Sequence, residues 1–336
     1  MRTVMLGASG VSSSIIGLGC MGMSEFYGTP DDVQSMATLE RAFDIGVTHY
    51  DTSNLYGRGH NEQLVGRFAK GRRDKITIAS KFGIRRDPDG PPGSTYDRDL
   101  DNSPAYMRQC CEESLSRLGI NEIDLYYVHR TDPDVPIEET VGALGDLVRE
   151  GKIRGIGLCE VSAEVLRRAH STHKIAALQS EYSLWTREPE HAVLPACREL
   201  GITFVAYSPL GRGFLTGAIS KADELAGDDF RLTSPRFQGA NFDANRSLVD
   251  HVRELAADKD CTAGQIAIAW LLHRGQDIVP IPGTKRISYL EENVASAGIR
   301  LSAAEVARIE EILPVGGAAG DRYESDFKGN PEAARS

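Results

Sequence analysis

Three consecutive apolar runs in the sequence each end at a polar residue whose type could do chemistry. These residues are Asp51 and Tyr56 after 47–50, Lys81 after 76–80, and His129 after 123–128. Residues at the C-terminal ends of barrel strands point into one rim, which is where active sites form. We therefore expect a carboxylate, a phenol, an ammonium and an imidazole to meet in one partly dry pocket.

A phenol beside an ammonium predicts proton donation. A tyrosine with an ordinary pKa near 10 is a poor proton donor at neutral pH. At roughly 4 Å and an effective dielectric constant of about 20, the Lys81 ammonium would stabilise the Tyr56 phenolate by on the order of 4 kcal/mol. After screening by solvent, we expect the pKa of Tyr56 to be lowered by roughly 1–3 units. Asp51 would keep the ammonium charged, and His129 would orient a carbonyl oxygen.

These four groups can polarise and protonate a C=O group, but they include no obvious nucleophile and no metal site. The missing electron pair must then come from a cofactor, and hydride is its natural form. Taken alone, Asp51 could be a turn or cap residue and Lys81 a solvated rim charge. Tyr56 could equally be a packed loop aromatic, and His129 a structural histidine. Their coincidence at three adjacent strand ends favours the chemical interpretation.

The rest of the chain supplies elements that would position these groups. Short β-rich runs alternate with longer amphipathic patterns, and the runs are 15–20, 47–50, 76–80, 123–128, 153–158, 175–179, 202–207 and 278–281. Eight strands, each followed by a helix, fit a closed parallel barrel or a doubly wound sheet. No interdomain linker is evident in the composition. We therefore expect an α/β fold in which one (β/α)8 TIM barrel domain spans residues 1–336.

Segments outside the eight repeats complete this barrel. Residues 3–6 and 11–14 would form an N-terminal β-hairpin that closes its bottom. The long segments 83–102 and 208–242 follow strands and would lie as loops on the C-terminal face. The tail from about 315 is Gly, Ala and charge, which leaves a mobile lid and a disordered end as open alternatives.

Several predicted helices carry recognisable end signals. The segment Thr29-Pro30-Asp31-Asp32 predicts an N-cap followed by a proline at the first helical position, and Ser103-Pro104 predicts the same arrangement. Capping boxes are expected at 262–265 and 302–305. The glycines expected to adopt left-handed conformations after helices are Gly46, Gly119, Gly151 and Gly201.

The segment 17–22 matches the letters of the dinucleotide fingerprint G-x-G-x-x-G. That fingerprint needs a helix that opens at the glycines, so that the helix N-terminus meets the pyrophosphate. Here the chain continues to Pro30 before a helix pattern starts. We therefore expect a tight turn after the first strand and no Rossmann site.

Composition limits the classes of function. The chain has 336 residues, of which 41% are hydrophobic and 26% charged, as in globular proteins with a substantial core. Its net charge of −10 argues against non-specific binding to nucleic acid or membrane surfaces. No apolar run approaches the roughly 18 residues of a membrane span. Because the N-terminus is too rich in Gly and Ser for a signal peptide and the six cysteines show no CxxC, we expect a cytoplasmic protein with reduced thiols.

Taken together, the motifs resemble the aldo-keto reductase family over nearly the whole chain. The segment 50–57 resembles the family's Asp…Tyr-Gly signature, and Lys81 and His129 match the other two catalytic positions. Further matching segments are 155–162, 179–184, 206–213, 281–286 and 290–293. The resemblance implies that Tyr56 is the general acid, Lys81 the group that tunes its pKa, Asp51 the partner of Lys81, and His129 the group that orients the carbonyl.

The same resemblance implies a barrel that holds NADPH without a Rossmann domain. Cys159, Glu160 and Gln179 would lie near the nicotinamide carboxamide, with Tyr207 stacked under the ring. Ser208, Leu210 and Gly213 would line the pyrophosphate. The adenosine half would be held by Gly283, Thr284, Lys285, Arg286, Glu292 and Asn293.

Some positions bear on the affinity for the cofactor and on the choice between NADPH and NADH. Cys159 stands where a serine hydroxyl is commoner, so its contact with the carboxamide would be weaker, and Glu160 stands where Asn is often found. Lys285 and Arg286 lie directly before a predicted helix, with Gly283 giving access, and would suit a 2′-phosphate dianion. This pattern favours NADPH over NADH.

The implied function is the reduction of a small-molecule aldehyde or ketone. Tyr27, Trp185 and Phe214, with parts of 83–102 and 230–242, would line the substrate pocket, although ordinary packing explains them equally well. Two other classes stay open: an NADP(H)-binding partner subunit, as voltage-gated potassium-channel β subunits are, and a hydrolase or lyase on a similar barrel. The sequence indicates neither the particular carbonyl compound nor the oligomeric state.

Overall fold

Eight parallel strands form the centre of the computed structural model, which describes residues 1–86, 99–219, 221, 225 and 229–323. In the order of hydrogen-bonded neighbours they are β3 (Leu18–Gly19), β4 (His49–Asp51), β5 (Thr77–Phe82), β8 (Ile123–Val128), β9 (Ile153–Cys159), β10 (Ile175–Glu181), β11 (Thr203–Tyr207) and β12 (Ile278–Pro280). Each overlaps one of the runs predicted to be a strand. The predicted (β/α)8 barrel is thereby confirmed.

Hydrogen bonds between the first and last strands close the sheet into a barrel. The Gly17 N–H donates to Pro280 O at 3.0 Å, and the Gly19 N–H donates to Pro282 O at 3.2 Å. A Cβ at position 17 would lie 2.9 Å from Ile281 Cγ2, so only glycine permits this approach. The G-x-G-x-x-G glycines therefore belong to the barrel seam and to the 3-10 turn that follows it.

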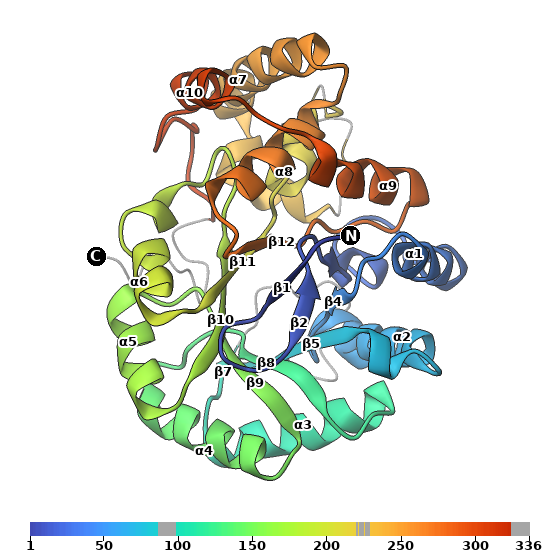
Figure 1. Cartoon of the computed structure of the whole chain (residues 1–336), viewed down its shortest axis with the longest axis vertical. Helices are drawn as coiled ribbons and strands as arrows, with labels where there is room; N and C mark the ends of the chain where they lie inside the picture. The colour runs from blue at the N-terminus through green and yellow to red at the C-terminus, as the bar shows by residue number, and fades with distance from the viewer. Residues whose placement is uncertain (87–98, 220, 222–224, 226–228, 324–336) are drawn as a thin grey trace.

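Helices surround the strands, as Figure 1 shows. Their bounds are α1 (Asp32–Asp44), α2 (His60–Ala69), α3 (Pro104–Leu118), α4 (Ile137–Arg149), α5 (Ala163–Thr172), α6 (Val193–Leu200), α7 (Gly239–Asp258), α8 (Ala263–Arg274), α9 (Ile287–Ala295) and α10 (Ala303–Ile312). Within the described ranges, no helix combines the length and the apolar character that a membrane crossing requires.

Most predicted helix caps are present. Ser103 caps α3, and both predicted capping boxes are formed, at α8 and α10. The four glycines expected after helices all have positive φ. The prediction for α1 was wrong: Asp31 is the N-cap, because its carboxylate accepts the Gln34 N–H at 2.9 Å, and Pro30 lies outside the helix. An aspartate is a better cap than a threonine, so the helix begins two residues later than predicted.

The predicted N-terminal hairpin is formed by β1 (Thr3–Met5) and β2 (Ser12–Ser14), which pair antiparallel. Leu6 and Val11, from its turn, are buried in the barrel interior with strand residues such as Leu125. The Gly7 N–H donates to the Thr203 hydroxyl at 3.0 Å, at the start of β11. The hairpin therefore covers the N-terminal end of the barrel, where Figure 1 shows it lying across the strands.

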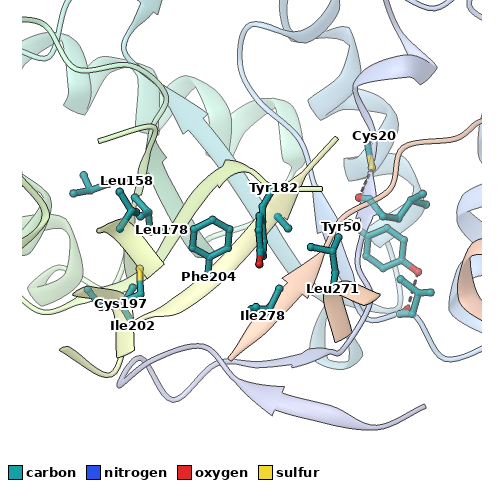
Figure 2. Close-up of a cluster of buried hydrophobic side chains, with 14 of the residues drawn as sticks. Cys20, Tyr50, Leu158, Leu178, Tyr182, Cys197, Ile202, Phe204, Leu271 and Ile278 are labelled. Atoms are coloured by element: carbon teal, nitrogen blue, oxygen red, sulfur yellow. Dashed lines mark hydrogen bonds between the residues drawn. The ribbon is translucent and has the colours of Figure 1, made fainter. Parts of the chain in front are cut away.

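A second apolar layer lies between the strands and the helices. Leu158, Leu178, Phe204 and Ile278 contribute from four neighbouring strands, and Leu271 contributes from α8 (Figure 2). Full burial of each such side chain stabilises the fold by about 1.5–3 kcal/mol. This layer fixes the helices against the strands, so the C-terminal rim of the barrel has a rigid base.

Long connections follow the C-terminal ends of the strands. The segment 83–102 contains a short antiparallel pair, β6 (Ile84–Arg85) and β7 (Asp99–Leu100), and its prolines at 88, 91 and 92 lie outside the described residues. After β11 come the 3-10 helices η5 (Gly211–Thr216), η7 (Phe230–Thr233) and η8 (Pro235–Phe237). The described part of the tail is packed at its end, because Arg322 is 1% exposed. The remainder of the predicted lid or disordered end, 324–336, lies outside the described residues.

We expect Gly66→Ala to destabilise the protein. A Cβ at Gly66 in α2 would lie 2.5 Å from Leu118 O at the end of α3. Overpacking against backbone should lower the free energy of unfolding by about 1–3 kcal/mol, which outweighs the gain in helix propensity of about 1 kcal/mol. Urea denaturation followed by circular dichroism measures the change.

Gly142→Ala in α4 is the matched control. No heavy atom lies within 4 Å of a Cβ placed there, so this variant should be more stable by about 0.5–1 kcal/mol. Similar effects of the two substitutions would show that contact between α2 and α3 does not require glycine.

Candidate active site

The register of the strands brings the predicted catalytic groups to one rim. Asp51 is the last residue of β4, Lys81 lies one residue before the end of β5, and His129 directly follows β8. The His129 N–H donates to Phe82 O at 2.7 Å, which ties the segment after β8 to the end of β5. Tyr56 joins them from the 3-10 helix η2 (Tyr56–Gly59), so the structure brings all four groups together.

The Lys81 ammonium lies at the centre of this cluster and is completely buried. It forms an ion pair with Asp51, donates to Thr52 O at 2.8 Å, and lies 3.4 Å from the Tyr56 hydroxyl. Gln179 Nε2 donates to the second Asp51 oxygen at 2.8 Å. A buried ion pair needs such additional hydrogen bonds to offset the loss of hydration. The pair is therefore held in one geometry.

Burial and charge act in opposite directions on Tyr56. Burial raises the pKa of the phenol and the Lys81 ammonium lowers it, and burial prevails, so the pKa rises to about 12. The predicted lowering of the pKa of Tyr56 was therefore wrong, because burial outweighs the Lys81 ammonium and the Asp51 carboxylate adds to the effect of burial. Burial alone would lower the pKa of Lys81, but Asp51 raises it above its ordinary value. At neutral pH the ammonium is charged and the phenol keeps its proton.

His129 stands edge-on to the phenol. Its ring makes an angle of 83° with the Tyr56 ring, with the ring centroids 5.9 Å apart. Its Nδ1 lies 3.3 Å from the Ser53 hydroxyl. A partner at Nδ1 fixes the orientation of an imidazole ring. The loop after β4 thus holds both Tyr56 and His129.

A sharp turn after β4 positions Tyr56. Gly57 has a φ of 55°, and a Cβ there would lie 2.9 Å from Ser24 Cβ. The buried Asn61 amide accepts from the Thr52 hydroxyl at 2.6 Å and donates to the Ser24 hydroxyl at 2.7 Å. These bonds join the loop that carries Tyr56 to the loop before α1, so the phenol is fixed from two sides.

The residues expected around the nicotinamide lie beside the cluster of Asp51, Tyr56, Lys81 and His129. Cys159 ends β9 and is buried, and burial raises the pKa of its thiol to about 12, so the thiol is neutral. The Glu160 N–H donates to Gln179 O at 3.0 Å, and the Tyr207 hydroxyl donates to Glu160 Oε1 at 2.7 Å. Gln179 also contacts Asp51. The residues expected around the nicotinamide are therefore continuous with the cluster of Asp51, Tyr56, Lys81 and His129.

Glu160 is a buried and ionised acceptor. Burial would raise the pKa of its carboxyl, but Arg322 and Arg130 lower it to about 2. Glu160 Oε2 is buried and has no hydrogen-bond partner among the described residues. A carboxylate oxygen in this state suits a ligand that brings an N–H donor.

The segment after β11 forms a turn bordered by cations. Ser208 and Gly213 have positive φ values of 48° and 90°, and Leu210 lies between them, directly before η5. The Arg231 guanidinium donates to Arg212 O at 3.3 Å and lies against Gly213. Turns with left-handed residues and nearby cations suit anionic groups.

The segment before α9 contacts the loop before α1. The Thr284 hydroxyl accepts the Arg286 N–H at 3.0 Å, and the Arg286 side chain is exposed. Lys285 Nζ donates to Tyr27 O at 2.9 Å and to Thr29 O at 2.7 Å. The structure therefore places Lys285 as a bridge between two loops, next to Arg286.

The other residues expected near adenosine lie around the same helix. Gly283 is exposed and Asn293, within α9, is buried. Glu292 Oε1 accepts from the Thr262 hydroxyl at 2.7 Å, which joins α9 to the N-cap of α8. Glu292 and Asn293 thus lie within α9, whereas Gly283 and Thr284 lie between β12 and that helix.

Two of the three predicted pocket residues, Trp185 and Phe214, lie in contact. Trp185 and Phe214 stack with ring centroids 4.9 Å apart and are 5% and 2% exposed. Phe237 packs edge-on against Phe214 at 5.3 Å, so these aromatic rings form a packed cluster. Tyr27 is partly exposed and lies under the Arg231 guanidinium at 5.4 Å. Trp185 and Phe214 thus belong to a packed aromatic cluster, and the substrate-pocket role of all three residues stays a prediction.

Sequence reasoning missed the residues that surround Glu160. Arg322 Nη2 donates to Glu160 Oε1 at 2.7 Å and to the Tyr207 hydroxyl at 3.0 Å. Arg130, directly after His129, also acts on the Glu160 carboxyl. No periodic pattern marks Arg322, because it comes from a tail without a predicted element. An Arg-Tyr pair in a stretch of Gly and Ala was its only local signal.

The described residues contain no group of three or more His, Cys, Asp and Glu side chains arranged to hold a metal ion. All six cysteines are free thiols. Burial raises the pKa of Cys111 and Cys197 to about 12, so these thiols are neutral near pH 7.

A parallel barrel with an acid–base cluster at the C-terminal ends of its strands has the form of a barrel enzyme. Residues 15–314 match the model of the aldo/keto reductase family. The chain belongs to this family, and it is an oxidoreductase of the kind that uses a nicotinamide cofactor and acts on small molecules.

Known relatives agree with this assignment over nearly the full length. The chain is 44% identical over 324 residues to probable aldo-keto reductase 1 of Glycine max, covering 96% of this chain and 92% of the relative. A glycerol dehydrogenase from Gluconobacter oxydans has a similar structure, with a TM-score of 0.85, 27% identity, and 96% and 97% of the two chains covered. The holo form of an aldo-keto reductase from Bacillus halodurans gives a TM-score of 0.76 at 27% identity, with 98% and 100% covered.

We expect Tyr56→Phe to leave tyrosine ionisation of the cofactor-free protein unchanged below about pH 11. Burial raises the pKa of Tyr56 to about 12, so its phenol contributes no tyrosinate absorbance in that range. An alkaline ultraviolet titration of the two proteins measures this. A Tyr56→Phe variant that loses tyrosinate absorbance at lower pH would mean that the ammonium prevails over burial.

Proposed function

We propose that the protein is an NADPH-dependent reductase that converts aldehydes or ketones to alcohols, with Tyr56 as the general acid. The observation that carries this proposal is the buried Lys81 ammonium, paired with Asp51 and 3.4 Å from the Tyr56 hydroxyl. A phenol next to a fixed cation can give up its proton when negative charge develops on a carbonyl oxygen. Membership of the aldo/keto reductase family supports the same reaction class.

The residues around the cluster fit a nicotinamide cofactor. The unpartnered Oε2 of Glu160 is a suitable acceptor for a carboxamide N–H, and the neutral Cys159 thiol and Gln179 adjoin it. Tyr207 would stack against the ring, and Ser208, Leu210 and Gly213 would hold the pyrophosphate. The adenosine half would be held by Gly283, Thr284, Lys285, Arg286, Glu292 and Asn293. When bound, the cofactor supplies hydride to the carbonyl carbon.

Proton transfer is the task of the chain's own residues. The Tyr56 hydroxyl donates its proton to the carbonyl oxygen, which completes the alcohol as the carbonyl carbon gains hydride. The Lys81 ammonium stabilises the phenolate that is left, and Asp51 keeps that ammonium protonated. Because the pKa of Tyr56 is raised to about 12, the phenol retains its proton until the carbonyl oxygen becomes strongly basic. Protonation is therefore tied to the reaction step.

His129 would be the second donor to the carbonyl oxygen. The Ser53 hydroxyl holds its Nδ1, and the ring stands perpendicular to the phenol. Two donors converging on one oxygen stabilise the charge that develops there, as in an oxyanion hole. This arrangement would orient the substrate carbonyl toward the nicotinamide.

The segment before α9 supports a preference for NADPH over NADH. Arg286 is exposed, and Lys285 lies next to it with two of its donors on loop carbonyls. A guanidinium can bind a phosphate dianion through two parallel hydrogen bonds. The 2′-phosphate, which NADH lacks, would be the group bound by Thr284, Lys285 and Arg286.

We expect Tyr56→Phe to reduce kcat by a factor of about 10²–10⁴ and to leave the Kd of NADPH within about twofold, because only the proton donor is lost. A panel of aldehydes and ketones, with NADPH oxidation followed by absorbance, measures turnover. Tyr106→Phe on α3 is the control and should keep full activity. Retained turnover in Tyr56→Phe would contradict the assigned acid. Tight NADPH binding with negligible turnover by the natural chain would instead favour a partner subunit.

We expect Arg286→Ala to raise the KM for NADPH about tenfold and to leave the KM for NADH within about twofold, because one charge-assisted contact to the 2′-phosphate is lost. Steady-state kinetics with both cofactors measure this preference. Arg300→Ala removes another exposed arginine, beyond α9, and should change neither KM. Equal changes in the KM for NADPH and the KM for NADH would show that Arg286 does not act on the 2′-phosphate.

A further inference from the structure

The described end of the C-terminal tail brings a charged residue into the candidate site. Arg322 is 1% exposed, and its guanidinium reaches three strand ends. Its Nη2 donates to Glu160 Oε1 at 2.7 Å and to the Tyr207 hydroxyl at 3.0 Å, and its Nε donates to Glu181 Oε2 at 3.2 Å. Glu160 follows β9, whereas Glu181 and Tyr207 end β10 and β11. One side chain thus links three neighbouring strands at the rim.

The backbone of the tail is held where this contact requires it. Arg212 Nη1 donates to Arg322 O at 3.1 Å, and Arg236 Nε donates to Gly320 O at 3.2 Å. Asn245 of α7 exchanges two hydrogen bonds with the backbone of Ala319, at 2.8 and 2.9 Å. The segment after β11 and α7 therefore hold the tail.

Tyr323 extends the same contact. Its hydroxyl lies 3.3 Å from the Tyr207 hydroxyl, and the Arg212 guanidinium stacks over its ring at 4.9 Å. Tyr207 therefore meets both of the last two described residues of the tail. Their side chains act on the tyrosine that would stack against the nicotinamide.

The charges explain why Arg322 can be buried. A guanidinium removed from water needs carboxylate partners with good geometry. Glu160 and Glu181 are both buried, and Glu181 also meets Arg212 at 3.5 Å and Arg236 at 3.9 Å. Glu160 has fewer cations around it, so Arg322 is the guanidinium that holds its Oε1 directly.

We propose that Arg322 is a positioning residue for the nicotinamide end of the cofactor site. By holding Glu160 Oε1 and the Tyr207 hydroxyl, it leaves Glu160 Oε2 as the acceptor for the carboxamide and fixes the ring of Tyr207. This inference rests on the proposed function, because it assigns Arg322 a role toward the nicotinamide cofactor. The tail then completes the site that the strand ends begin.

The proposal predicts an effect confined to one half of the cofactor. Arg322→Ala should raise the Kd of NADPH about tenfold, because a buried charged partner is lost. Adenosine 2′,5′-bisphosphate carries only the adenosine half, so its Kd should stay within about twofold. Fluorescence titration and calorimetry measure both constants without turnover. Arg308→Ala, which removes an exposed arginine of α10, is the control and should change neither constant.

The pH dependence provides a readout that general loosening of the fold would not change. The charged and titratable groups that face Glu160 are Arg322, Arg130, Cys159, Glu181 and Tyr207, and the Tyr323 hydroxyl lies next to that of Tyr207. Arg322 and Arg130 lower the pKa of Glu160 to about 2 against the effect of burial. Without Arg322 this pKa should rise, so Glu160 takes up a proton more readily as pH falls. The ratio of the variant's NADPH Kd to that of the natural chain should grow from about pH 8 to pH 5.

Two further variants complete the test. Arg322→Lys keeps the charge without the paired N–H groups and should recover part of the affinity. Glu160→Gln combined with Arg322→Ala should lose less than the sum of the two single effects, because both act through one contact. Near-ultraviolet circular dichroism verifies that each variant is folded. If Arg322→Ala does not fold, the binding measurements are made with Arg322→Lys alone.

The outcomes separate this inference from the proposed function. Failure of the natural chain to bind NADPH would overturn the proposed function and the inference together. Normal NADPH binding by the natural chain with an unchanged Kd in Arg322→Ala would overturn the inference alone. An equal rise in the Kd of NADPH and of adenosine 2′,5′-bisphosphate would also overturn the inference alone. Tighter NADPH binding by Arg322→Ala would overturn it too, because Arg322 would then compete with the cofactor. Selective weakening of NADPH supports it.

Discussion

The ion pair between Lys81 and Asp51 is the constraint on which the rest of the site depends. Both side chains are almost completely removed from water, so each must find partners within the barrel. The parallel strands provide them, because adjacent strands end at the same rim and place the Thr52 carbonyl and the Gln179 amide against the pair. Breaking such a pair leaves a buried charge and typically costs 3–5 kcal/mol, so the geometry is rigid. Tyr56 and Gln179 are in direct contact with this pair.

The same burial sets the acidity of the phenol. A cation at 3.4 Å would by itself make Tyr56 more acidic, but its carboxylate partner and the lack of water act against it. The balance leaves the phenol protonated at neutral pH. Glu160 shows the opposite balance, because Arg322 and Arg130 outweigh burial and keep it ionised. Tyr56 is thus neutral and Glu160 ionised, because burial and neighbouring charges act on the two groups in different proportion.

Much of the fold and of the candidate catalytic cluster could be predicted from the sequence, because both depend on local patterns. Alternating β-rich runs and helix signals predicted all eight strands. Polar residues directly after those runs pointed to Asp51, Lys81 and His129 as site residues. The first helix was placed two residues early because Pro30 suggested a start that the stronger cap at Asp31 overrides. Trp185 and Phe214 lie in a packed cluster that only tertiary structure reveals. Arg322 escaped prediction because its partners, such as Glu160, are distant in sequence and no periodicity connects them.

The seam between Gly17 and Pro280 has a consequence for how the chain is made. The two residues come from opposite ends of the sequence, so the ribosome must synthesise nearly the whole barrel before they can meet. Until β12 emerges, the strands already made have two unpaired edges, and such edges invite pairing with other chains. The last strand is only Ile278–Pro280, yet its arrival removes both edges at once. The nascent protein therefore stays open to such pairing until its final strand has left the exit tunnel.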